Sequence, residues 1–203
     1  MIVVHAMEVI YVQQDEERLV EKAINGDARA FEILMEKHEA RMYAVALRMC
    51  GNREDAQDCL QDAMIRIYKA LPTFKGQSSF STWAYRITMN TCLDDLRRKK
   101  TRQASSLDAM LDLGWSPADE ENTPERSYGE KEVRRELSKA IQSLPEDMRA
   151  AVVLRDVQGF SYEEIASMLN INIGTIKSRI SRGREKLREI LSGNAELFGR
   201  GRV

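Results

Sequence analysis

The sequence predicts an all-helical protein in which two helical modules are joined by an acidic flexible linker. Residues of high helix propensity dominate a chain of 203 residues that contains only 11 glycines and 4 prolines. Apolar residues recur at helical spacing on both sides of the chain's centre, and no segment alternates as a strand would. Between Ser105 and Glu132, eight acidic residues stand against two basic ones, and Gly114, Pro117 and Pro124 interrupt the segment. Such a composition is typical of a linker.

The N-terminal module is expected to contain four helices. Gly26 and Gly51 suit the left-handed position that ends the first two, and Asn52 is a typical N-cap for the third, which Pro72 stops. His38 lies on the apolar stripe of the second helix, so we expect it to pack in the core rather than bind a ligand. The four helices are expected at residues 15–25, 27–50, 52–71 and 80–100.

The C-terminal module begins with an amphipathic helix, and Pro145 suits the first turn of the next. Ser161 and Glu164 have the spacing of a capping box, and Phe160 with Ile165 forms the matching hydrophobic staple. Because these local signals agree, a third helix should begin at Ser161. The helices of this module are expected at residues 131–144, 145–159, 161–170 and 172–190.

The last two helices meet at a tight polar connection over residues 170–172, with the small Ala166 where they would cross. This is the helix-turn-helix pattern, in which the second helix enters a DNA major groove. From Ile171 to Ile190 six basic residues stand against two acidic ones, although the whole chain carries 31 basic and 32 acidic residues. A merely solvated surface is the alternative, but the preceding capped helix and turn favour DNA binding. The face expected to meet base edges carries Lys177, Ser178, Ser181 and Arg182.

Other classes of protein are disfavoured by composition. The three cysteines, Cys50, Cys59 and Cys92, form no CxxC pair and only two histidines occur, so we expect reduced thiols, no metal and no cofactor. The sequence lacks a Ser-His-Asp set and a phosphate-binding glycine loop, so an enzyme is not expected. No apolar run is long enough for a membrane span, and the first residues are not expected to act as a signal peptide. Residues 1–14 are expected to be a flexible extension, with Met7 an alternative start.

Three segments, taken together, resemble the sigma factors of bacterial RNA polymerase, specifically the compact extracytoplasmic-function group that lacks the middle domain of larger members. They are NREDAQDCLQDAMIRIYKAL, TFKGQSSFSTWAYRITMNTCLDDLRRKK and SLPEDMRAAVVLRDVQGFSYEEIASMLNINIGTIKSRISRGREKLR. The resemblance covers most of residues 15–191. It implies a polymerase-binding and −10 module at 15–101, a linker at 102–130, a −35 module at 131–192 and a tail at 193–203.

The resemblance also implies three sets of contact residues. Clamp helices of the largest polymerase subunit would meet one face of the third helix, which carries Asp55, Asp58, Gln61, Asp62 and Arg66. The alternative interpretation of this face is an acidic surface that is simply solvated. The melted −10 strand would contact the next loop and helix through Phe74, Lys75, Gln77, Trp83, Arg86, Asn90, Arg97 and Arg98. For Trp83 the alternative is a structural role in the core of the module. The −35 element would contact the last helix: Thr175, Lys177, Ser178, Ser181, Arg182 and Arg184.

The implied partners are core RNA polymerase, including the flap of its second subunit, promoter DNA and an anti-sigma factor, all in the cytoplasm. The protein would direct transcription initiation and leave phosphodiester chemistry to the polymerase. A helix-turn-helix repressor or activator that dimerises through its N-terminal helices is the competing interpretation, and it predicts tight duplex binding without polymerase. A helical hydrolase or metalloenzyme is the competing interpretation from the enzyme class.

Overall fold

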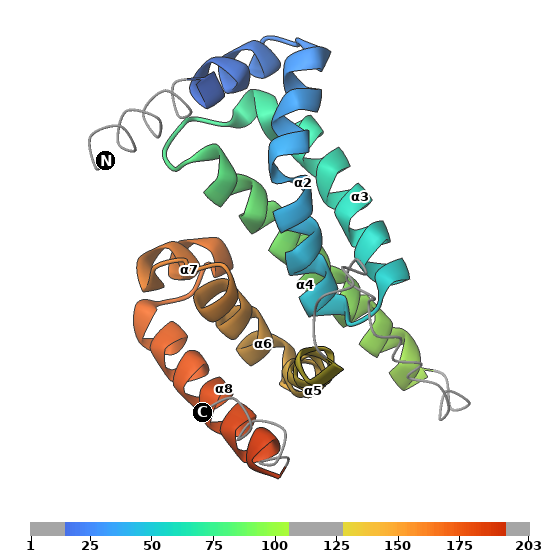
Figure 1. The fold of residues 1–203 in the computed structure, drawn as a ribbon. Coiled ribbons are helices and arrows are strands. Elements are labelled where there is room, and N and C mark those ends of the chain that lie inside the picture. The colour runs from blue at the N-terminus through green and yellow to red at the C-terminus, as the bar shows by residue number, and fades with distance from the viewer. Residues whose placement is uncertain (1–14, 106–127, 194–203) are drawn as a thin grey trace, which may run out of the picture.

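The computed structural model describes residues 15–105 and 128–193, and every regular element in these two ranges is helical (Figure 1). The predicted all-helical class is therefore confirmed. The predicted N-terminal extension, most of the linker and most of the tail lie outside the described residues. None of the helices in the described ranges is long and apolar enough to cross a lipid bilayer.

The N-terminal module begins with a helical stretch over residues 15–24, followed by α2 (Ala28–Cys50), α3 (Arg53–Ala70), a short 3₁₀ turn, η1 (Leu71–Thr73), and α4 (Phe80–Ser105). Asn52 caps α3 as predicted, with its side chain accepting from the backbone N–H of Asp55. Gly51 ends α2 with a φ of 86°, a left-handed conformation that glycine adopts without strain. The helix α4 continues past the predicted end at Lys100, because no glycine or proline follows to stop it.

His38 packs in the core of this module, as predicted. Its ring lies 5.5 Å from the ring of Phe80 and 6.4 Å from that of Tyr85, between ring centroids. Burial lowers the pKa of His38, and this effect outweighs the nearby Glu16 carboxylate, which acts to raise the pKa. The neutral imidazole is therefore the favoured form in the folded protein.

The C-terminal module contains α5 (Tyr128–Gln142), α6 (Glu146–Val152), η2 (Val153–Val157), α7 (Tyr162–Leu169) and α8 (Ile173–Ser192). The sequence predicted one regular helix over residues 145–159, but η2 is a π-helical turn in which Gln158 donates to the carbonyl of Val153, five residues back. Gly159 then ends the helical segment with a φ of 79°. The π-turn adds one residue to a helical turn, which shifts the residues beyond it around the helix axis.

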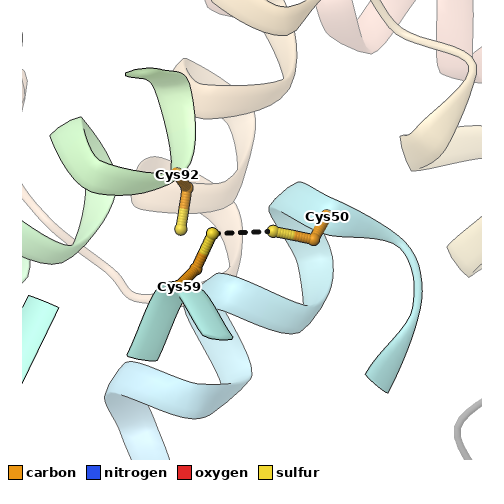
Figure 2. A group of neighbouring side chains, drawn as sticks. All are labelled: Cys50, Cys59 and Cys92. Atoms are coloured by element: carbon orange, nitrogen blue, oxygen red, sulfur yellow. Dashed lines mark hydrogen bonds between the residues drawn. The ribbon is translucent and has the colours of Figure 1, made fainter. Parts of the chain in front are cut away.

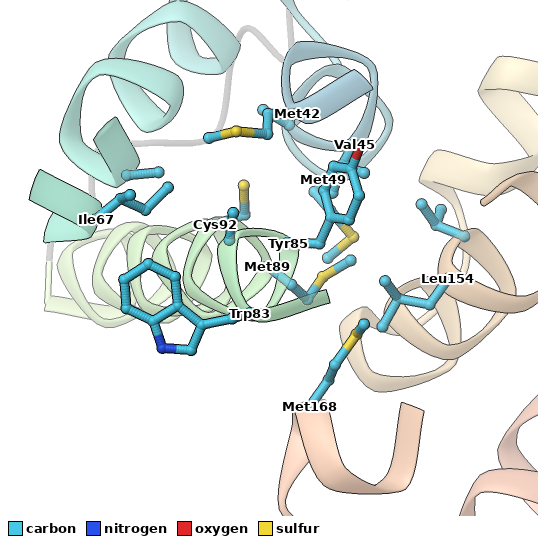
Figure 3. Packing of buried hydrophobic residues seen from close by; sticks show 14 of the residues in the cluster. Met42, Val45, Met49, Ile67, Trp83, Tyr85, Met89, Cys92, Leu154 and Met168 are labelled. Atoms are coloured by element: carbon cyan, nitrogen blue, oxygen red, sulfur yellow. The ribbon is translucent and has the colours of Figure 1, made fainter. Parts of the chain in front are cut away.

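The two modules share a continuous apolar core. Figure 3 shows Leu154 of η2 and Met168 of α7 reaching toward Met89 of α4, and all three belong to the same buried cluster. The Phe160 ring, which precedes α7, lies 5.5 Å from the ring of Tyr85 in α4. Apolar burial therefore holds the second module against α4 of the first.

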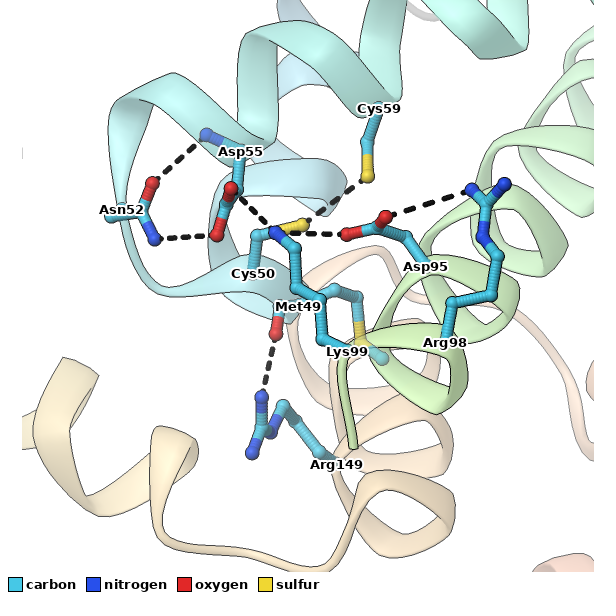
Figure 4. A network of polar contacts seen from close by, with 9 residues as sticks. All are labelled: Met49, Cys50, Asn52, Asp55, Cys59, Asp95, Arg98, Lys99 and Arg149. Atoms are coloured by element: carbon cyan, nitrogen blue, oxygen red, sulfur yellow. Dashed lines mark hydrogen bonds and ion pairs between the residues drawn. The ribbon is translucent and has the colours of Figure 1, made fainter. Parts of the chain in front are cut away.

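Hydrogen bonds also connect the two modules, at the C-terminal end of α2. The buried guanidinium of Arg149 in α6 donates to the carbonyl oxygen of Met49 at 2.6 Å (Figure 4). The amide of Gln142 donates to the carbonyl oxygen of Arg48 at 2.5 Å. The last carbonyls of a helix have no partner within the helix, so α5 and α6 supply donors to two residues in the last turn of α2.

Candidate nucleic-acid interface

The turn between α7 and α8 is built by local capping. Ser161 Oγ accepts from the backbone N–H of Glu164 at 3.1 Å, and the Glu164 carboxylate accepts from the backbone N–H of Ser161 at 2.8 Å, which confirms the predicted capping box. Asn170 ends α7 in a left-handed conformation with a φ of 53°, and Asn172 caps α8 by accepting from the backbone N–H of Thr175 at 2.8 Å. These caps fix where α8 begins relative to α7.

One side of α8 is buried and the opposite side is exposed. Ile176, Ile180 and Gly183 are buried, and Gly183 lies so close to α6 that a Cβ there would be 2.7 Å from Val152 Cγ2. The predicted −35 set then divides by exposure. The exposed members are Lys177, Ser178, Ser181, Arg182 and Arg184, whereas Thr175 is half-buried and its hydroxyl donates to Asn172. The exposed side therefore offers cations and hydroxyls to a partner.

Two of the basic residues of α8 are engaged within the protein. Arg179 donates to the Asp147 carboxylate of α6 at 2.6 Å, and Arg184 forms a two-pronged pair with Asp156 of η2 at 2.5 and 3.1 Å. Their charges are partly neutralised where they stand, and they hold α8 against the rest of the module. Lys177 and Arg182 are exposed and carry positive charge toward solvent, although the Lys177 ammonium also lies 5.7 Å from the centroid of the Tyr162 ring.

The predicted −10 residues divide into a packed aromatic pair and a set of accessible polar side chains. Phe74 and Trp83 pack together with 5.1 Å between ring centroids, and Trp83 is only 8% exposed. The alternative role of Trp83 as a core anchor is thus consistent with its burial. The remaining side chains in this region are accessible, with Lys75, Gln77 and Asn90 exposed and Arg86 half-buried. The aromatic residues support the loop, and the polar residues face solvent.

The C-terminal half of α4 carries cations that alternate with carboxylates. Arg97 and Arg98 are exposed, and each lies near a carboxylate one helical turn earlier: Arg97 is 4.0 Å from Asp94 and Arg98 is 3.5 Å from Asp95. Lys99 bridges Asp55 of α3 at 2.5 Å and Asp95 at 3.0 Å (Figure 4). Exposed pairs of this kind are weak, so Arg97 and Arg98 stay available to a polyanion.

The predicted polymerase-binding face of α3 is largely accessible. Asp58, Gln61, Asp62 and Arg66 are exposed, and Arg66 also donates to Asp94 of α4 at 3.1 Å. Asp55 differs, because it is half-buried and paired with Lys99. Burial by itself would raise the pKa of Asp55, but hydrogen bonds from Lys99 and Asn52 outweigh it and hold that pKa below its usual value. Asp55 therefore stays ionised as part of the α3–α4 contact.

Two apolar residues, absent from the predicted contact set, lie on the same exposed surface. Ile65 is 51% exposed and Tyr68 is 57% exposed. They follow Asp58 and Gln61 at helical spacing, so the periodicity could have placed them on this surface. Large apolar side chains beside an acidic surface favour a protein partner over plain solvation.

Comparison with known proteins supports the same interpretation. The family model for sigma-70 region 2 matches residues 34–102, and the model for sigma-70 region 4 matches residues 134–187. The chain is 37% identical over 183 residues to the RNA polymerase sigma-H factor of Pseudomonas aeruginosa, covering 88% of this chain and 95% of that protein. It is 35% identical over 179 residues to the ECF RNA polymerase sigma-E factor of Escherichia coli K12, covering 86% and 93%.

Solved structures show the same fold. The sigma factor RpoE of Bartonella quintana, crystallised with the anti-sigma factor NepR, has a TM-score of 0.67 and 27% identity, covering 81% of this chain and 98% of that chain. CnrH in complex with the cytosolic domain of CnrY has a TM-score of 0.64 and 23% identity, covering 88% and 98%. The repressor and hydrolase alternatives are set aside by these relationships. The chain belongs to the extracytoplasmic-function sigma factors, the non-enzymatic subunits that direct RNA polymerase to promoters.

Proposed function

We propose that this sigma factor divides promoter recognition between its two modules. In this proposal residues 15–101 bind core polymerase and hold the melted −10 strand, residues 131–192 read the −35 element, and residues 102–130 connect them. Residues 1–14 and 193–203 are assigned no contact. Because two weak DNA contacts on one connected chain raise each other's effective concentration, neither module needs to bind tightly alone.

The exposed side of α8 carries the −35 assignment. Lys177, Ser178, Ser181 and Arg182 are exposed together, while Arg179 and Arg184 are held by carboxylates of their own module. Base edges in the major groove accept hydrogen bonds from arginine and lysine, and serine can bond several edges or phosphates. We assign base contacts to the exposed four and assign Arg184 to the phosphate backbone. Thr175, whose N–H and hydroxyl both donate to Asn172, would reach DNA only from the start of the helix.

The −10 assignment rests on the loop before α4 and on the exposed side of that helix. An unstacked base needs hydrogen-bonding groups at its edge, and Asn90, Lys75 and Gln77 are exposed and can supply them. Phe74 and Trp83 would support this loop from beneath. Arg86, Arg97 and Arg98 would follow the strand's phosphates.

The polymerase would contact α3 through an acidic rim around an apolar centre. Asp58, Asp62 and Gln61 supply polar contacts to the basic clamp helices of the largest subunit, and Ile65 with Tyr68 supplies the apolar contact. Asp55 and Arg66 would act at the edge of this surface, since both already pair with α4. The C-terminal module would meet the flap of the second subunit.

We also place this protein in the cytoplasm, where RNA polymerase acts, and propose an anti-sigma factor as its regulator. The Bartonella quintana relative, which shares its fold, was crystallised with such a protein. The accessible α3 and α8 surfaces are the ones that a regulator would have to cover to prevent polymerase and promoter binding.

Run-off transcription with purified core polymerase on genomic fragments tests the proposal. Arg182→Ala should cost about 1–3 kcal/mol in binding at −35 and relax base choice there. Arg179→Ala, on the side paired with Asp147, is the matched control and should leave base choice unchanged. Asn90→Ala should leave duplex −35 binding intact and impair open-complex formation, with Asn25→Ala as its exposed amide control.

Two outcomes would contradict the proposal. A chain that confers no start-site choice on core polymerase is not acting as this family does. Equal loss of −35 binding and strand opening in Asn90→Ala would reject the division between the modules.

A further inference from the structure

Three thiols from three different helices converge at one corner of the N-terminal module (Figure 2). Cys50 is the last residue of α2, Cys59 lies in α3 and Cys92 lies in α4. The three sulfur atoms all lie within 4.8 Å of one another, and the Sγ atoms of Cys50 and Cys59 are 3.5 Å apart. No spacing motif reveals this group, because each cysteine comes from a different helix.

The separation of the sulfur atoms fits a shared metal ion. A zinc–thiolate bond is about 2.3 Å long, so two sulfur ligands at a tetrahedral angle lie about 3.8 Å apart, and about 4.0 Å apart in a trigonal plane. The Cys50–Cys59 separation is slightly shorter than these values, and all three separations lie within 4.8 Å, so small side-chain movements would bring the sulfur atoms to these distances. We propose that Cys50, Cys59 and Cys92 form a three-thiolate site for one thiophilic divalent cation of the Zn²⁺ type.

The surroundings suit such an ion in accessibility. Cys59 and Cys92 are buried, whereas Cys50 is half-buried and opens one side of the group toward solvent, where a fourth ligand such as water can bind. Three thiolates around a divalent ion leave one net negative charge. The Lys99 ammonium is already bridged to the Asp55 and Asp95 carboxylates, so the fourth ligand is expected to be a neutral one such as water.

The site would join the three main helices of the N-terminal module beside its contact with the C-terminal module. Cys50 directly follows Met49, whose carbonyl accepts from Arg149 of α6. It directly precedes Gly51, against which the Gln142 side chain of α5 packs so closely that a Cβ would meet it at 2.8 Å. A bound ion would therefore stiffen the α2–α3 corner on which α5 and α6 rest.

The test uses the full chain, reduced and stripped of metal. Titration with Zn²⁺ against a chromophoric chelator should give one ion per chain, and Cd²⁺ should produce a thiolate-to-metal charge-transfer band in the ultraviolet. Bound metal should also slow alkylation of all three thiols. Cys50→Ser should weaken binding at least tenfold. Loss of an outer-shell partner already costs a metal site about tenfold, and Cys50 would be a direct ligand. His38→Gln, which removes a possible ligand elsewhere, should leave the affinity unchanged.

Circular dichroism checks that each variant is folded, and if Cys92→Ser fails to fold, the half-buried Cys50→Ser still decides the question. Equal affinity in the wild type and Cys50→Ser would overturn the proposal. So would alkylation of the three thiols at rates that metal does not change, or a Cys50–Cys59 disulfide that forms while added Zn²⁺ stays free.

Discussion

Arg149 offers the sharpest test of how the two modules are held together. The residue is 8% exposed, and its guanidinium donates four hydrogen bonds: to the carbonyl oxygens of Met49 at 2.6 Å, Gln142 at 2.5 Å and Leu144 at 3.1 Å, and to the Gln142 side-chain oxygen at 2.7 Å. Burial lowers the pKa of Arg149, because the guanidinium loses some of the water that would stabilise its charge. The acceptors are neutral, so the hydrogen bonds must offset that cost.

The effect of Arg149→Met follows from these contacts. A hydrogen bond to a charged group contributes about 1.5–3 kcal/mol, so four contribute about 6–12 kcal/mol. Burying the guanidinium costs several kcal/mol, which methionine does not incur. The variant also leaves the Met49, Gln142 and Leu144 carbonyls without this donor. Each buried acceptor left unpaired costs about 1–3 kcal/mol, so we expect a net loss of about 3–5 kcal/mol in the free energy of unfolding once the relief of burying the charge is counted.

Urea unfolding followed by circular dichroism measures this loss. Arg155→Met is the matched control, because Arg155 in η2 donates one hydrogen bond, to the Phe160 carbonyl at 2.7 Å, and stacks on Tyr162 at 4.7 Å. It should cost no more than about 1–2 kcal/mol. Arg149→Lys should fall between the two, since an ammonium cannot reproduce the planar fork. A loss for Arg149→Met no larger than that of Arg155→Met would refute the reasoning.

Three further perturbations test the helix contact, the ion pair and the polymerase surface. Gly183→Ala should lower the free energy of unfolding by roughly 1 kcal/mol in urea titration. Crowding against Val152 costs about 1–3 kcal/mol, and the higher helix propensity of alanine returns about 1 kcal/mol. A stabilised variant would contradict the close contact. Lys99→Met should destabilise the protein at neutral pH. The depressed pKa of Asp55 contributes stability above its unfolded value of about 3.9, and this contribution is lost as pH falls through the folded pKa, so the wild type and the variant should converge in acid-unfolding curves. Ile65→Asp should weaken core-polymerase binding in a pull-down assay while thermal unfolding changes little, because Ile65 is half-exposed in the free chain.

Local signals in the sequence predicted much of the fold. The capping box at Ser161, the Asn52 cap and the glycine at the end of α2 each act within a few residues, so their effect is legible in the sequence itself. The exposed surface of α8 was predicted for the same reason, since helical periodicity assigns each side chain to a side of the helix. The exposure of Lys177, Ser178, Ser181 and Arg182 agrees with that prediction.

Contacts between distant residues could not be predicted in this way. The pairs of Arg179 with Asp147 and of Arg184 with Asp156 span 32 and 28 residues, and they decide which cations of α8 remain available. The bond from Arg149 to Met49 spans 100 residues, and the three cysteines meet only after α2, α3 and α4 pack. The π-turn η2 also escaped prediction, because a periodic apolar pattern does not report one inserted residue.

The sequence by itself therefore determined the helical class, the positions of most helix ends and the exposed side of α8, because these depend on backbone capping and side-chain periodicity over a few turns. The tertiary structure alone decided that the modules share one core, that Arg149 joins them, and that three thiols gather at one corner. These features depend on which helices approach one another, and that is settled by packing over the whole chain rather than by any local run of residues.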